Sequence, residues 1–125
     1  RKRNKIADEY NLAFKNLPIK LPSVHKDNIS SFHLYPIRIP YKNNLENRNR
    51  LYKLLLDENI FVNMHYIPVY RHPFYQKLGF KKGYCPEAEL YFKEVLSLPI
   101  FPSLSKSDQY RVVEKVCEFI NKNGS

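Results

Sequence analysis

Hydrogen-bonding side chains and aromatic rings are concentrated in one short stretch, residues 63–75, with the sequence NMHYIPVYRHPFY. Asn63, His65 and Tyr66 supply an amide, an imidazole and a phenol at its start. Such groups hydrogen-bond phosphate oxygens and hydroxyls, and aromatic faces pack against rings. Because loops that leave a strand often carry binding residues, the stretch suits a sugar nucleotide. An aromatic-rich edge of the core would show the same composition, and the residues alone leave both interpretations open.

The two histidines of this stretch lack the spacing of a metal site. His65 and His72 are seven residues apart, whereas paired histidine ligands on a helix stand about four apart. Pro68 lies between them and interrupts any helix. We therefore expect no metal.

The other motifs of catalytic type carry little information. Ser103 and Lys106 match a bare S-x-x-K pattern, but its companion motifs are missing and Ser105 suits a helix cap. Cys85 and Cys117 have no neighbouring group in the sequence that would activate a thiol, and Cys117 fits a small core residue. Neither G-x-x-x-x-G-K nor G-x-G-x-x-G occurs, so a self-contained phosphate-binding loop is missing.

Composition limits the class of protein. The chain has 125 residues, enough for one domain, and its 43% apolar content supplies a core. Two cysteines without a C-x-x-C pattern suit a reducing, cytoplasmic setting, and no apolar run approaches the ~20 residues of a membrane span. The net charge of +9 attracts anions, but the basic residues are dispersed along the chain.

The elements that must position these groups alternate between helix and strand. Apolar residues at helical spacing predict a first helix over 1–17, ended by Pro18, and no capping residue starts it, which indicates a chain cut from a longer one. Strands are predicted at 32–40, 60–66 and 95–100. Further helices are predicted at 45–56, from Pro86 to Glu94, and from a capping box at Ser105. We therefore predict an α+β fold, with helices packed on a small antiparallel or mixed sheet of about three strands.

Within the last helix, an apolar stripe is expected to face the core. Its members are Val113, Val116, Cys117 and Ile120. Asn123 and Gly124 are expected to end the helix.

A series of short motifs then runs through the chain in order. They are RNKIADEY at 3–10, SFHLYPIRI at 31–39, LLDENI at 55–60, HYIPV at 65–69, HPFY at 72–75, CPEAE at 85–89 and VLSLPIFP at 95–102. Together they resemble the C-terminal part of the DegT/DnrJ/StrS-type sugar aminotransferases. The match covers essentially the whole chain, and the V-L-S-L-P-x-F-P and H-Y-x-P motifs are its most specific parts.

The resemblance implies a cofactor and an architecture for the whole enzyme. The family uses pyridoxal phosphate or pyridoxamine phosphate to aminate a keto sugar on a nucleotide such as UDP or dTDP, usually with glutamate as donor. Its fold is the aspartate-aminotransferase type (fold type I), a homodimer with a large cofactor domain and a small C-terminal domain. Residues 1–125 are similar to the small domain, and residues 1–17 to a truncated interdomain helix. The cofactor lysine would then lie in the large domain, upstream of Arg1, so we expect this chain alone to be inactive.

The resemblance also implies a site. In the family, residues around the H-Y-x-P turn line the nucleotide-sugar site, which implies substrate-binding roles for Asn63, Met64, His65 and Tyr66. It implies no catalytic residue in this chain. The turn is most similar to the branch that makes a UDP-linked 4-amino-4,6-dideoxy-N-acetyl-altrosamine. The dipeptide at 70–71 departs from the family pattern of a histidine followed by a polar residue, and roles beyond Tyr66 stay open.

A second class of function is a stand-alone basic α+β module that binds RNA or another polyanion. Such binding needs basic and aromatic residues interleaved on one surface. Here the tyrosines lie among prolines and the lysines lie elsewhere in the sequence, so we expect neither nucleic acid nor a membrane as partner. For a detached small domain, we expect the apolar side of the first helix (Ile6, Tyr10, Phe14) to be partly uncovered and to favour self-association.

Overall fold

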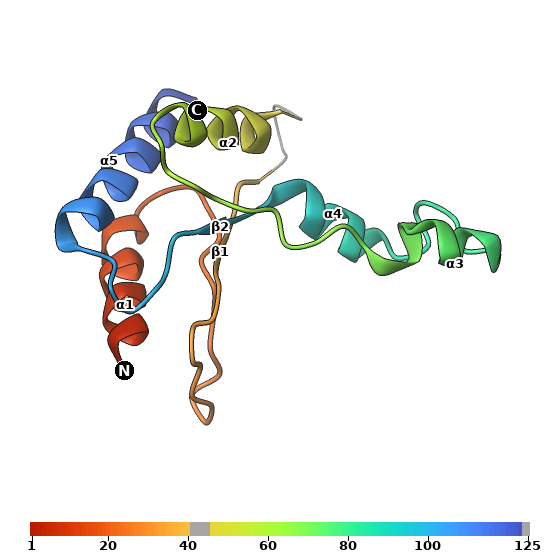
Figure 1. The fold of residues 1–125 in the computed structure, drawn as a ribbon, viewed down its shortest axis with the longest axis horizontal. Coiled ribbons are helices and arrows are strands. Elements are labelled where there is room, and N and C mark those ends of the chain that lie inside the picture. The colour runs from red at the N-terminus through yellow and green to blue at the C-terminus, as the bar shows by residue number, and fades with distance from the viewer. Residues whose placement is uncertain (41–45, 124–125) are drawn as a thin grey trace.

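The computed structural model describes residues 1–40 and 46–123, and Figure 1 shows their arrangement. The fold within these ranges is α+β, as predicted. Its elements are, in chain order, α1 (Lys2–Phe14), β1 (Tyr35–Arg38), α2 (Asn47–Asp57), the 3₁₀ helix η1 (Val69–Arg71), α3 (Pro73–Lys77), α4 (Pro86–Glu94), β2 (Val95–Leu98) and α5 (Lys106–Asn123). The described helices do not include one long and apolar enough to cross a bilayer. The predicted helix end at Gly124 lies outside the described residues.

The sheet has two strands in the described ranges, where about three were predicted. β1 and β2 pair antiparallel, with Ile37 opposite Leu96. Each outer edge carries one further bridge, between Lys20 and Arg38 on β1 and between Asn63 and Ser97 on β2. The predicted third strand at 60–66 is thus reduced to a single bridge.

Its neighbours on β2 explain why the strand at 60–66 does not form. Asn63 and Ser97 exchange both backbone hydrogen bonds, at 3.2 and 2.7 Å. In that antiparallel register the next hydrogen-bonded pairs would be Phe61 with residue 99 and residue 65 with residue 95. Residue 99 is a proline and has no N–H to donate. The carbonyl of residue 95 already accepts a hydrogen bond from Arg48 Nη1 at 3.5 Å. Both neighbours weaken further pairing, and the bridge described here consists of the one pair.

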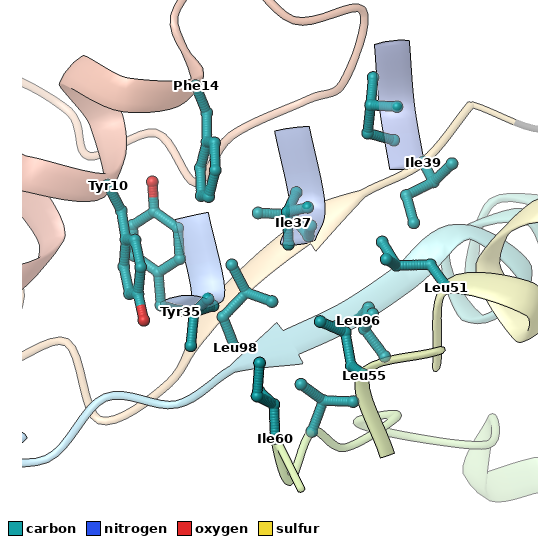
Figure 2. Close-up of a cluster of buried hydrophobic side chains, with 14 of the residues drawn as sticks. Tyr10, Phe14, Tyr35, Ile37, Ile39, Leu51, Leu55, Ile60, Leu96 and Leu98 are labelled. Carbon is teal, nitrogen blue, oxygen red and sulfur yellow. The ribbon is translucent and has the colours of Figure 1, made fainter. Parts of the chain in front are cut away.

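The main hydrophobic core lies on one face of this sheet, under α1, α2 and α5 (Figures 1 and 2). Figure 2 shows Tyr10 and Phe14 of α1 beside Tyr35, and Leu51 and Leu55 of α2 beside Leu96. We call the sheet and these three helices the body. Successive strand residues point to opposite faces, so the core face carries Leu96 and Leu98 while Ser97 points to the other face.

The first helix ends at Phe14, before the predicted stop at Pro18. Our expectation that its apolar side would be partly uncovered is wrong, because Ile6, Tyr10 and Phe14 are all buried. The helix is also tied to the body by hydrogen bonds: Tyr10 Oη donates to the carbonyl of Pro99 at 2.9 Å, and Gln109 Nε2 donates to the carbonyl of Ile6 at 2.9 Å. Packing within this chain therefore covers the face.

The last helix begins where predicted, and its buried side includes the predicted stripe but is wider. Ser105 Oγ accepts a hydrogen bond from the N–H of Asp108 at 3.0 Å, which confirms the predicted cap. The predicted stripe was Val113, Val116, Cys117 and Ile120. The structure buries Val116 and Ile120, and Val113 and Cys117 are partly buried and pack against the core. Val112 and Phe119 are buried as well.

A second part of the chain projects from the body. Residues 66–94, which we call the arm, contain η1, α3 and α4 and extend away from the sheet (Figure 1). α4 begins at Pro86 and ends at Glu94, as predicted. At its base, Arg38 of β1 forms an ion pair with Glu94 at 2.8 Å.

Candidate functional site

The predicted site segment, residues 63–66, crosses the sheet edge where the arm leaves the body. Its first residue is fixed through the backbone, by the two hydrogen bonds between Asn63 and Ser97. The Asn63 side chain is exposed. Met64 is partly buried and packs against the main core, so its side chain serves as an anchor for the segment.

His65 is held by its side chain. Its Nδ1 lies 2.9 Å from Oγ of Ser97, a hydrogen bond whose direction depends on the tautomer of the ring. The ring also meets Tyr66 edge-on, with centroids 4.5 Å apart. The imidazole is half-buried, and its orientation is thus restrained from two sides.

Tyr66 is open to solvent, with 68% of its surface exposed. Its ring lies beside that of His65, and the exposed Asn63 precedes His65 by two residues on the same segment. All three groups can hydrogen-bond phosphate or hydroxyl oxygens. The structure thus places His65 and Tyr66 side by side, on a segment fixed to β2 through Asn63.

The remainder of the aromatic stretch does not join them. His72 is exposed at the start of α3, in the arm. Tyr70 is buried, and its hydroxyl donates to Glu89 Oε1 at 2.9 Å. Residues 70–75 therefore help to build the arm, in η1 and at the start of α3.

Glu89 is the centre of the arm, a role that the sequence did not reveal. Its carboxylate accepts hydrogen bonds from the N–H of Gly83 at 3.1 Å, from the hydroxyl of Tyr70, and from the Arg71 guanidinium at 3.1 Å. The Gly83 hydrogen bond is the main cause that lowers the pKa of Glu89, with Tyr70 and Arg71 adding to it against the effect of burial. Burial, followed by the hydrogen bond to Glu89, raises the pKa of Tyr70. The sequence indicated only that Glu89 lies in the first turn of the helix that begins at Pro86.

Ser97 is the second residue that sequence reasoning missed. It is 4% exposed and sits in the middle of β2. The available signal was a single polar residue in the apolar run Val-Leu-Ser-Leu at 95–98. A polar residue that is buried in a strand usually has a hydrogen-bond partner, and here that partner is His65.

The described ranges also contain side chains of the kinds that bind metals or act as thiol nucleophiles. No three His, Cys, Asp or Glu side chains come together there as metal ligands would. Cys85 and Cys117 are free thiols. Partial burial raises the pKa of Cys117, which makes it a weaker nucleophile than an ordinary thiol.

Comparison with known proteins agrees with the family resemblance of the sequence motifs. The sequence pattern of the DegT/DnrJ/EryC1/StrS aminotransferase family matches residues 1–117. The spore coat polysaccharide biosynthesis protein SpsC of Bacillus subtilis is 38% identical over 123 residues, which are 96% of this chain and 32% of SpsC. The UDP-4-amino-4,6-dideoxy-N-acetyl-beta-L-altrosamine transaminase of Campylobacter jejuni is 32% identical over 126 residues, 97% of this chain and 32% of that protein.

Solved structures agree with the sequence comparison. The crystal structure of S. venezuelae DesV in complex with a ketimine intermediate superposes with a TM-score of 0.84 at 31% identity, and covers 95% of this chain and 31% of DesV. The chain therefore spans about a third of the length of the relatives it matches. Because the family pattern covers nearly all of its residues, the chain belongs to the DegT/DnrJ/EryC1/StrS aminotransferase family.

Proposed function

We propose that this chain is the small domain of a cytoplasmic nucleotide-sugar aminotransferase. The enzyme would use pyridoxal phosphate to transfer an amino group, with glutamate as donor, to a keto sugar linked to UDP or dTDP. Family membership supports this, as do relatives named as transaminases of UDP- and dTDP-linked amino sugars. Two free cysteines suit the cytoplasm. Relatives at similar identity act on different sugars, so the altrosamine branch is not favoured over the others.

The cofactor would be bound outside these residues. A lysine that carries pyridoxal phosphate is desolvated in a pocket. The lysines that the structure describes are exposed, apart from the half-buried Lys115, whose ammonium pairs with Glu58 at 3.2 Å. They do not fit that role. We therefore expect the isolated chain to be inactive and to develop no absorbance band of a lysine-bound cofactor.

Within the enzyme, this chain would bind the nucleotide sugar and support a homodimer. The single observation that carries the binding role is the fixed imidazole of His65 beside the open phenol of Tyr66, both on a segment anchored to β2. A preorganised segment binds a ligand with less loss of conformational freedom. Exposed apolar side chains on the arm, namely Phe74, Leu78 and Tyr84, support a further contact with a partner.

Saturation kinetics of the full-length enzyme test the binding role. His65→Ala and Tyr66→Phe should each raise KM for the nucleotide sugar by roughly 5–30-fold, because a lost hydrogen bond to the ligand costs about 1–2 kcal/mol. The turnover number should change less, since neither side chain is expected to transfer a proton during the reaction. Tyr110→Phe is the matched control, because Tyr110 lies on α5 and is 66% exposed, almost as open as Tyr66. Unchanged KM in both site variants would show that the turn is only scaffold.

The alternative, a basic RNA-binding module, would have one fewer aromatic ring available than its sequence offers. Single-strand binding needs exposed rings on which bases can stack. Tyr70, in the middle of the aromatic stretch, is buried against Glu89. Its ring is therefore unavailable for stacking.

A further inference from the structure

We propose that Ser97 is a positioning residue for His65: its hydroxyl donates a hydrogen bond to Nδ1 and thereby keeps the ring proton on Nε2. The proposal rests on the proposed function in one respect, namely that this Nε2–H group then donates to an oxygen of the nucleotide sugar. The positioning itself follows from contacts within this chain.

Ser97 directs its backbone and its side chain at the same short segment. Its N–H and C=O are both bonded to Asn63, at 2.7 and 3.2 Å. Its Oγ lies 2.9 Å from His65 Nδ1. Because residues two apart on an extended chain point to the same side, one serine can hold both the backbone at 63 and the ring at 65.

The burial of Ser97 decides which group donates. A serine hydroxyl has one hydrogen, and within the described residues its only partner is Nδ1 of His65. If Nδ1 carried a proton, it would be the donor, and the serine hydrogen would be left without an acceptor at a residue that is 4% exposed. Buried donors are rarely left unsatisfied, whereas an oxygen can more easily lack one of its possible donors. The geometry thus favours the ring with its proton on Nε2.

This arrangement prepares His65 to bind an acceptor. In the part of the chain that the structure describes, Nε2 has no hydrogen-bond partner. A phosphate oxygen only accepts hydrogen bonds at neutral pH, so a ring fixed as an Nε2 donor is complementary to it. A ring free to exchange tautomers would present a lone pair at Nε2 for part of the time.

Nitrogen NMR of the 125-residue chain tests the positioning without any substrate. The chain is labelled with 15N-histidine, His65→Ala identifies the His65 resonances, and spectra are recorded at about pH 8.5, roughly two units above an ordinary histidine pKa. We expect a protonated Nε2 and a hydrogen-bonded, unprotonated Nδ1. Ser97→Ala should move the Nδ1 resonance and admit the second tautomer, whereas Ser97→Thr, which keeps the hydroxyl, and Ser103→Ala, at an exposed serine, should not. A proton on Nδ1 of the unmodified chain, or an Nδ1 resonance that ignores Ser97→Ala, would overturn the proposal.

A double-mutant cycle in the full-length enzyme supplies a second, independent test. Ser97→Ala should raise KM for the nucleotide sugar by about 2–10-fold at nearly constant kcat. It should raise KM no further when His65 is already alanine, because the serine acts through that ring. Additive effects would show that Ser97 acts by another route and would refute the proposal. If instead His65→Ala leaves KM unchanged while the NMR result stands, the proposed binding function fails and the positioning of the ring does not.

Discussion

Replacing Tyr10 by phenylalanine removes one hydroxyl from the centre of the body and leaves the ring in place. The residue is 0% exposed. Its ring stacks on Phe14, with centroids 5.6 Å apart, and lies 4.9 Å from the ring of Tyr35. The hydroxyl donates to the carbonyl of Pro99 at 2.9 Å. This single hydrogen bond joins α1 to the residue that follows β2.

The expected cost follows from the loss of one internal hydrogen bond and the desolvated carbonyl left behind. A net hydrogen bond contributes about 1 kcal/mol, and an unpaired buried acceptor adds to that. Because Pro99 is half-buried and water can replace part of the contact, we expect the free energy of unfolding to fall by roughly 1–2 kcal/mol. Burial, with a smaller contribution from Tyr35, raises the pKa of the Tyr10 phenol well above its ordinary range, so the hydroxyl is a donor throughout neutral pH.

Urea unfolding of the 125-residue chain measures this cost. For a slope of about 2 kcal/mol/M, the midpoint should fall by roughly 0.5–1 M at an unchanged slope. Tyr110→Phe removes the same hydroxyl from an exposed ring on α5 and should shift the midpoint hardly at all. If the two variants behave alike, the Tyr10 hydroxyl contributes nothing, and α1 is held by the packing of its rings alone.

Two further predictions concern the cap of α5 and the Glu89 carboxylate in the arm. Ser105→Ala should lower the free energy of unfolding by about 1 kcal/mol, because the hydroxyl caps α5 through the N–H of Asp108. In calorimetry this corresponds to a fall in Tm of roughly 3–6 °C. Ser103→Ala should have no effect, and an equal loss in both variants would contradict the cap. Acid should destabilise the arm, because folding lowers the pKa of Glu89. The stabilisation that the Glu89 carboxylate provides is complete above the ordinary glutamate pKa of about 4.3, and it is lost as the pH falls through the lower pKa of the folded state. The amide resonance of Gly83, which donates to Glu89, should move in that range, and a resonance that stays in place from pH 6 to pH 2.5 would show that the carboxylate does not support the arm.

Features whose partners are close in sequence could be predicted. The start of α5 was visible because Ser105 and Asp108 contain both halves of the cap. The start of α4 was visible because a proline at the first helical position needs no partner at all. In both cases the physical cause lies within one turn of helix.

Features that depend on distant partners could not be predicted from the same sequence. Helix α5 has apolar residues at 112, 113, 116, 117, 119 and 120, which support more than one possible inner face. The face actually buried is the one that lets Gln109 donate to the carbonyl of Ile6, 103 residues away in the chain. The predicted strand at 60–66 did not form, although its side chains alternate at the start, with Ile60 and Val62 buried and Phe61 exposed. Whether that segment pairs is decided by β2.

The candidate site depends on the same pairing. The motif at 63–66 named the residues, but a histidine in a sequence carries no information about which of its nitrogens is engaged. That follows only when Asn63 lies opposite Ser97, because this register puts a hydroxyl within 2.9 Å of His65 Nδ1. A slip by one residue would turn Leu96 or Leu98 toward the ring in place of the serine, and Nδ1 would lose its partner. The orientation of the imidazole therefore depends on the one backbone pair that joins this segment to β2.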